Sequence, residues 1–310
     1  MSPTSSPAAQ PDTASSATPR GGAQRGGGRV GLSPSRAKDY LQCPLLFRFR
    51  TIDRLPEPPS PAASRGTLVH TVLERLYDLP AEHRHVAKAQ ELLDPAWQEL
   101  RASQPEVADM FGTPEELRAW LASAQELVAK YFEVENPRRL EPAEREKFVE
   151  VELASGILLR GFVDRIDVAP SGAVRVVDYK TGKSPRPQYS AEAMFQMRFY
   201  ALILWRLTGT PPKRLQLVYL GDSRVLTLDP TVDELVATEE QLEGLWDTII
   251  RDARRGEFQP RRSRLCDWCS FQAHCPLFDG SPPELPTEGV SRLLNSVRPA
   301  REAGAVIPSD

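Results

Sequence analysis

The sequence predicts an α/β fold, a sandwich of helices and one sheet, with a helical insertion ahead of the sheet. Three observations predict it. Apolar residues recur at helical spacing in several segments before residue 135. Short β-branched and apolar runs follow between residues 147 and 179, and a long apolar helix with two further short runs comes after them.

The first expected helix begins at Ser33, a good N-cap residue, followed by Pro34 at the first helical position. Pro44 should bend or interrupt it, because proline lacks the N–H that continues a helix. A proline-rich connector spans residues 56–63. Further helices are expected at 65–79, 84–102 and 114–132, the last two within a helical insertion over residues 80–135.

The sheet is expected to begin with three strands joined as a meander. A Pro-Ser-Gly turn at 170–172 separates the second strand from the third. Acidic residues in the first turn should open the last helix, since they complement the helix dipole. The expected strands are 147–153, 157–168, 173–179, 215–220 and 225–228, with helices at 191–208 and 231–254.

The two ends of the chain differ in composition from the middle. Residues 1–31 are rich in Ser, Pro, Ala, Thr and Gly, so we expect a disordered tail there. Residues 280–310 are expected to form a second, flexible tail, in which Val290, Leu293 and Leu294 could form one short helix. The ordered domain is therefore expected over residues 32–279.

Charge and hydropathy exclude some function classes. The formal net charge is -3 and the sequence pI is about 5.9, so any DNA binding must depend on local basic patches. No apolar run approaches the roughly 18 residues needed to span a membrane. The N-terminus also lacks the apolar region of a signal peptide. We therefore expect a cytoplasmic protein with no membrane association.

Two aspartates and a lysine form the central chemical pattern. Asp164 and Asp178 lie on neighbouring expected strands, and Lys180 projects from the same strand face as Asp178. Two carboxylates held together repel each other, and Mg²⁺ or Mn²⁺ would relieve that repulsion. The cation would polarise a scissile phosphate, while Lys180 would orient the attacking water or neutralise developing charge. An Asp-x-Lys pair is also typical of a solvated strand face, although the buried-type neighbours Val176 and Val177 disfavour that alternative.

Three further polar residues could join this site. His70 lies on the expected helix 65–79 and could supply an imidazole nitrogen to the cation, or could be a satisfied core histidine. Gln196 and Tyr200 are four residues apart, so they share one face of an apolar helix that could border a polar cleft. Asp167 is expected to point to the opposite sheet face.

These motifs together resemble the RecB-family exonucleases of the PD-(D/E)xK nuclease superfamily, over about residues 32–278. The resemblance implies a restriction-endonuclease-like core, which is a mixed central sheet flanked by helices, with an N-terminal helical region and a C-terminal iron–sulphur segment. It also implies a metal-dependent DNA exonuclease. The implied metal ligands are His70, Asp164 and Asp178, and the implied catalytic residues are Lys180, Asp178, Asp164, Gln196 and Tyr200.

The four cysteines are spaced as one plus three. Cys266, Cys269 and Cys275 form a compact C-terminal triplet, while Cys43 lies far upstream. Four thiolates can hold either a [4Fe–4S] cluster or, as the alternative, a structural Zn²⁺. The one-plus-three spacing resembles the iron–sulphur signature of RecB-like nucleases. Either would tie the C-terminal segment to the first helix.

An arginine-rich stretch over residues 251–264 precedes the cysteine triplet, and Trp268 lies between the first two cysteines of the triplet. Arginines with aromatic residues suit single-stranded DNA, although Trp268 could instead pack on the cluster. We expect DNA, single-stranded or at ends, as the partner, in repair or recombination. The alternatives are a non-catalytic iron–sulphur DNA-binding subunit and a hydrolase acting on another substrate. The sequence has no Gly-x4-Gly-Lys-Ser/Thr motif, so the resemblance implies a helicase acting in trans.

Overall fold

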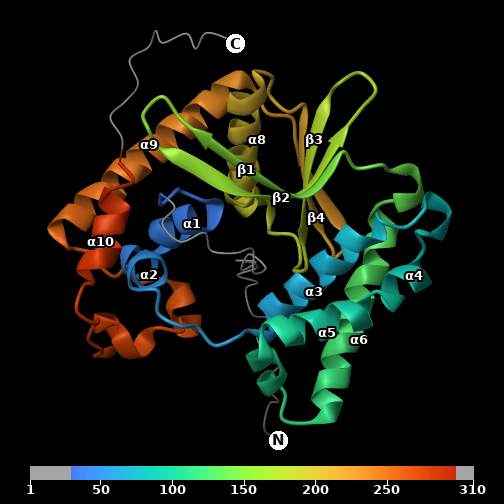
Figure 1. Ribbon diagram of the computed structural model, residues 1–310, viewed down its shortest axis with the longest axis horizontal. Coiled ribbons are helices and arrows are strands. Elements are labelled where there is room, and N and C mark those ends of the chain that lie inside the picture. Colours follow the sequence, from blue (N-terminus) through green and yellow to red (C-terminus); the bar gives the residue numbers. More distant parts are fainter. Residues whose placement is uncertain (1–28, 298–310) are drawn as a thin grey trace, which may run out of the picture.

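The computed structural model describes residues 29–297, and it has a five-stranded mixed sheet between two layers of helices (Figure 1). The strands follow chain order across the sheet, and all neighbours are antiparallel except β3 and β4. The predicted α/β class is confirmed. The strands are β1 (Glu144–Glu152), β2 (Leu158–Val168), β3 (Val174–Lys180), β4 (Arg214–Tyr219) and β5 (Arg224–Leu228).

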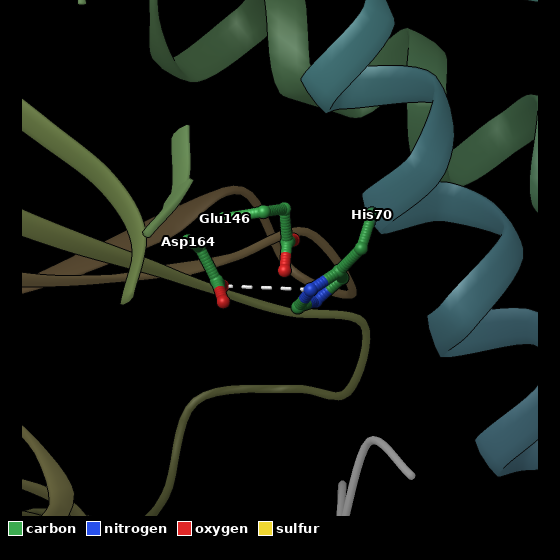
Figure 2. Close-up of side chains that lie close together, drawn as sticks. All are labelled: His70, Glu146 and Asp164. Carbon is green, nitrogen blue, oxygen red and sulfur yellow. Dashed lines mark ion pairs between the residues drawn. The ribbon is translucent and has the colours of Figure 1, made fainter. Parts of the chain in front are cut away.

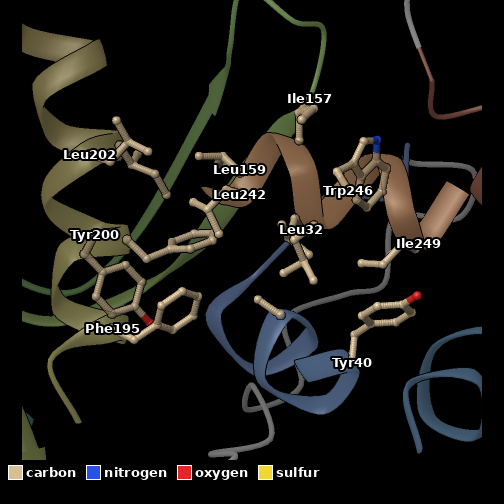
Figure 3. Close-up of a cluster of buried hydrophobic side chains, with 14 of the residues drawn as sticks. Leu32, Tyr40, Ile157, Leu159, Phe195, Tyr200, Leu202, Leu242, Trp246 and Ile249 are labelled. Carbon is tan, nitrogen blue, oxygen red and sulfur yellow. The ribbon is translucent and has the colours of Figure 1, made fainter. Parts of the chain in front are cut away.

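Each face of the sheet has its own hydrophobic core. One core joins the sheet to α1 (Pro34–Gln42), α8 (Phe195–Thr208) and α9 (Val232–Arg255). Figure 3 shows Leu32, Leu159, Leu202, Trp246 and their neighbours filling this layer. The other core lies under the helical insertion and α3 (Pro61–Leu76). The remaining α-helices are α2 (Pro44–Phe47), α4 (Val86–Glu91), α5 (Leu93–Ser103), α6 (Pro114–Val134), α7 (Ser190–Ala193) and α10 (Thr287–Leu294).

Local sequence signals account for several helix ends. The Ser33 side chain accepts a hydrogen bond from the N–H of Arg36, as expected of an N-cap residue. The chain bends at Cys43, so that α2 begins at Pro44. Thr231 and Glu234 form a reciprocal capping box at the start of α9.

The first part of the predicted tail at 280–310 is ordered, and the short helix expected to carry Val290, Leu293 and Leu294 is present as α10, residues 287–294. Leu293 is buried against the α1–α8–α9 layer, so this part is not a flexible tail. A Cβ at Gly289 would lie 2.6 Å from the carbonyl oxygen of Ile52, so glycine permits this close approach. The apolar face of α10 is stabilised by burial against the α1–α8–α9 layer. The composition of the segment alone does not reveal that contact. The rest of this tail, from residue 298, lies outside the described residues.

Order also begins earlier than predicted at the other end. Val30 is buried, and Leu32 forms an isolated parallel bridge with Leu159 beside the first half of β2. Only residues 29–31 of the expected N-terminal tail are described. The segment 29–33 thus extends the sheet where β3 does not reach.

A buried arginine connects the sheet to the insertion. Arg165 on β2 is only 1% exposed and makes a two-pronged ion pair with Glu135 at the end of α6. It also donates to the hydroxyl of Tyr179 at 2.5 Å. Asp167 pairs with Arg165 and Arg175 rather than facing the site. These bonds hold β2, β3 and α6 together beside the polar residues described next.

Candidate functional site

Three potential metal ligands meet between α3 and the first two strands. The donor atoms of His70, Glu146 and Asp164 lie within 4.8 Å of one another, and they form the one such group of three or more in residues 29–297. Figure 2 shows His70 reaching from α3 toward both carboxylates. Nδ1 of His70 lies 3.5 Å from Oδ2 of Asp164.

The backbone of Tyr179 closes this group from the β3 side. Its N–H donates to Oδ2 of Asp164 at 2.8 Å, and its carbonyl oxygen lies 3.0 Å from Nε2 of His70. Asp164 lies just past the last β2–β3 register pair, Arg165 with Val177. The strands separate at that point, which gives the Asp164 carboxylate room to lie between them.

Glu146 owes its position to an irregular backbone. Its φ is 44°, in the left-handed region, and it has no register partner between the pairs that Arg145 and Lys147 form with β2. A non-glycine residue in this region is strained, and such strain is often found at functional sites. Glu146 was not among the residues singled out from the sequence. It stands among several acids of an exposed strand, so no local pattern distinguishes it.

Asp178, Lys180 and Gln196 form a second polar group on the α8 side of β3. Nζ of Lys180 lies 2.6 Å from Oδ2 of Asp178 and 2.9 Å from Oε1 of Gln196. Nε2 of Gln196 donates to Oδ1 of Asp178 at 2.8 Å. The lysine only donates and the carboxylate only accepts, so these contacts fix the orientation of the Gln196 amide. Gln196 therefore holds the aspartate and the lysine in place together.

Tyr200 supports this group through a close approach to β2. Its hydroxyl lies 3.4 Å from Nε2 of Gln196. A Cβ at Gly161 would lie only 2.7 Å from Cε1 of the Tyr200 ring. Glycine at position 161 thus makes the space that the ring occupies.

The electrostatics of the site favour a cation. Burial raises the pKa of Asp164 well above its usual range, and the neighbouring charges of Asp178 and Glu146 raise it further. Oδ2 of Asp178 is buried and has no aligned hydrogen-bond donor among the described residues, although Lys180 is close. Carboxylate oxygens, a carbonyl oxygen and one imidazole suit Mg²⁺ or Mn²⁺. A divalent cation fits this donor set, because it would offset the repulsion that now raises the Asp164 pKa.

The sequence of the chain matches the PD-(D/E)XK nuclease superfamily over residues 31–276. The chain belongs to the PD-(D/E)XK nuclease superfamily. Divalent-metal dependence is general to this family, and the five-stranded mixed sheet is consistent with its restriction-endonuclease-like core. A nuclease acts on nucleic acid, so the site described above is the candidate active site of a nuclease.

The chain is also similar to two phage proteins and to one solved structure. The chain is 23% identical over 290 residues to the "Gene 69 protein" of Mycobacterium phage L5, with 79% of this chain and 96% of the relative covered. It is also 23% identical to the "Gene 69 protein" of Mycobacterium phage D29, with the same coverage. A crystal structure of a "Putative exonuclease" from Eubacterium rectale has a TM-score of 0.51 and 18% identity, covering 77% of this chain and 86% of that chain. The similarity to this solved structure is a similarity of fold.

Most of the site residues predicted from the sequence lie close together in the fold. His70 and Asp164 meet as expected, and Lys180 lies beside Asp178 with Gln196 between them. Glu146, however, completes the group within 4.8 Å, while Asp178 faces Lys180 and Gln196. Asp178 still lies close enough to Asp164 to raise its pKa. Its role as a metal ligand stays a prediction.

The four cysteines line one pocket, although they come from two distant parts of the chain. Cys43 stands between α1 and α2, and the triplet stands among the short helices at Arg264–Trp268, Gln272–His274 and Pro276–Phe278. All four thiols are free and half-buried. The backbone N–H of Arg261 donates to Sγ of Cys43, and the N–H of Ser263 donates to Sγ of Cys266, both at 3.3 Å. We call this group the thiol pocket.

The arginine-rich stretch is partly used to build this pocket. Arg261 donates to the carbonyl of Leu41, and Arg262 donates to the carbonyl of Leu277 at 3.0 Å. The Trp268 ring is 49% exposed, so it does not fill the pocket. Within residues 29–297, no helix combines the length and apolar character needed to cross a membrane.

Proposed function

We propose that this nuclease is a divalent-metal-dependent DNA exonuclease of the RecB-like type that acts on single-stranded ends, in repair or recombination. One observation carries the proposal. His70, Glu146 and Asp164 converge on one side of the Tyr179 backbone, and Asp178 with Lys180 stands on the other. Lys180 therefore lies next to the group of potential metal ligands formed by His70, Glu146 and Asp164.

The arrangement suits phosphodiester hydrolysis. A bound divalent cation would polarise the phosphate and lower the pKa of a water molecule. Lys180, held by Asp178 and Gln196, would direct its ammonium group toward the attacking water or the phosphate oxygens. Tyr200 would keep the Gln196 amide in place, and the Tyr179 N–H would fix the orientation of the Asp164 carboxylate.

Cleavage of defined DNA substrates tests this proposal. We expect Mg²⁺ or Mn²⁺ to support degradation of end-labelled linear single strands, but not of closed circular single strands, which have no ends. Asp178→Asn and Lys180→Ala should each lower the rate at least about 100-fold. The matched controls Asp109→Asn and Lys213→Ala change exposed residues outside the site and should keep the wild-type rate. Absence of cleavage by the wild type on every DNA would refute the proposal and leave a non-catalytic DNA-binding role.

We further propose that the thiol pocket holds a [4Fe–4S] cluster with a structural role. Zinc sites more often use two close pairs of cysteines, whereas here one distant cysteine joins a compact triplet. A four-iron cluster binds one thiolate at each of its four iron atoms, so four thiols that line one pocket suit it. Backbone N–H groups directed at sulphur also stabilise bound thiolates.

Anaerobic purification followed by spectroscopy tests the cluster separately from catalysis. We expect a visible thiolate-to-iron absorbance band with about four irons and four sulphides per chain. Cys43→Ala should remove the band, because it deletes the ligand that joins the pocket to α1. One zinc per chain with no visible band would contradict the cluster and establish the alternative.

A further inference from the structure

Two phenylalanines lie exposed on the first two strands of the sheet. Phe148 on β1 is 47% exposed and Phe162 on β2 is 42% exposed. They are direct cross-strand partners, with ring centroids 5.2 Å apart and ring planes inclined by 55°. Aromatic rings gain much from burial, so an exposed adjacent pair indicates a surface that something else covers. We call Phe148 and Phe162 the ring pair.

The ring pair lies on the same side of the sheet as the metal-ligand group. Gly161 and Val163 face α8, since the first contacts Tyr200 and the second belongs to the core of that layer. Phe162 stands between them in sequence, so it points to the opposite side. Asp164 also points there, toward His70 on α3. The rings therefore border the candidate active site.

Arginines continue the same strand face beyond the rings, beside the acids Glu150 and Glu152 of β1. Arg160 is two residues before Phe162 and is paired across the strands with Glu150, whose carboxylate lies 3.9 Å away. The Arg160 side chain packs against Gly31, where an added Cβ would lie 3.1 Å from its Nε. Arg36 donates to the carbonyl of Gly31 at 2.6 Å, so both arginine side chains lie beside Gly31. Burial, together with the nearby charges of Arg160 and Arg54, lowers the Arg36 pKa to about 10.

The order along β2 is therefore carboxylate, ring, guanidinium, at residues 164, 162 and 160. Each step of two residues covers about 6.6 Å. Arginines gathered against one another bind phosphate well, and rings stack on bases that are not already paired. Bases inside a duplex are stacked on each other, so they cannot reach the rings without unpairing.

We propose that the ring pair is a stacking platform for the unpaired bases of a DNA strand entering the active site, with Arg160 and Arg36 binding its phosphates. This rests on the proposed nuclease function and names the substrate feature that the surface selects. Stacking of one base on an aromatic ring strengthens binding by about 5- to 150-fold. The platform would give the nuclease its preference for single strands, because an abasic strand or a duplex offers the rings no free base.

Binding in EDTA tests the platform, because without metal no cleavage complicates the measurement. Anisotropy of fluorescent strands would compare an ordinary single strand, an abasic strand of equal length and a blunt duplex. The double variant Phe148→Ala/Phe162→Ala should bind the ordinary strand at least about 5-fold more weakly and the abasic strand unchanged. Arg160→Gln should weaken both strands to a similar extent.

A conservative variant separates stacking from simple apolar contact. Phe148→Leu/Phe162→Leu keeps apolar side chains but removes the rings, so it should lose the same preference for the ordinary strand. Retention of that preference, or equal weakening of ordinary and abasic strands, would overturn the platform. Unchanged binding by the alanine variant would also overturn it and assign the rings to another partner.

The platform and the nuclease function can fail independently. Absence of cleavage by the wild type in Mg²⁺ and Mn²⁺ would refute the nuclease function, whereas the EDTA measurement would still report on the rings. Because both rings are exposed, the variants should keep the wild-type melting temperature, which verifies that they are folded.

Discussion

Gly161→Ala provides a sharp test of how the sheet supports the catalytic group. The new Cβ would lie 2.7 Å from Cε1 of Tyr200, whereas contacting carbons prefer about 3.5–4.0 Å. The ring or the strand must therefore move by about 1 Å, and such overpacking costs about 1–3 kcal/mol. The Tyr200 hydroxyl contacts Gln196, which holds Asp178 and Lys180. A displacement of about 1 Å at a catalytic group can lower the rate about 100-fold.

Two assays in a double-mutant cycle measure this effect. Urea unfolding gives the free energy of unfolding, and the initial rate on an end-labelled single strand gives activity. In a Tyr200→Ala background the ring is absent, so Gly161→Ala should be neutral, or stabilising by about 0.5–1 kcal/mol, since glycine weakens a strand. Equal costs of Gly161→Ala in both backgrounds would refute the proposed contact, as would full activity of the single variant.

Four further predictions concern the metal ligands, the buried arginine and the thiols. Glu146→Gln should weaken Mn²⁺ binding about 10- to 100-fold by calorimetry, whereas unchanged affinity would place the ion elsewhere. Mn²⁺ affinity should also fall as pH is lowered, because the raised pKa of Asp164 makes protons compete for its carboxylate; an affinity independent of pH would contradict this. Arg165→Met should lower the free energy of unfolding by about 3–5 kcal/mol, since Glu135 would lose its two short bonds to Arg165 and keep only the longer ion pair with Arg175, at 3.8 Å; a loss below about 1 kcal/mol would show that the Arg165–Glu135 pair contributes little. Cys275→Ala should lower the melting temperature together with the visible absorbance, and an unchanged melting temperature would show that the thiol pocket does not stabilise the fold.

Much of the fold was predictable because its signals are local. Alternating apolar residues predicted β1, β2 and β3 within a few residues, and Ser33 with Pro34 predicted the start of α1. The same local geometry predicted parts of the site. Residues two apart on a strand share a face and residues four apart on a helix share a face, which explains the groupings Asp178 with Lys180 and Gln196 with Tyr200.

The features that the sequence did not reveal depend on contacts between distant segments. Glu146 joins His70 and Asp164 only because β1 adopts a left-handed backbone conformation opposite the end of the β2–β3 pairing. The order of α10 depends on its approach to Ile52, more than 200 positions earlier in the chain. The ring pair needs the register of β1 and β2, which periodicity alone does not fix.

We expect one divalent cation to bind between α3 and the first three strands. Anomalous diffraction from crystals grown with Mn²⁺ would locate it. A single strong peak should lie within about 2.0–2.3 Å of ligand atoms from His70, Glu146 and Asp164, with Asp178 or the Tyr179 carbonyl beside it. A peak elsewhere, with these side chains keeping their present contacts, would refute this metal site.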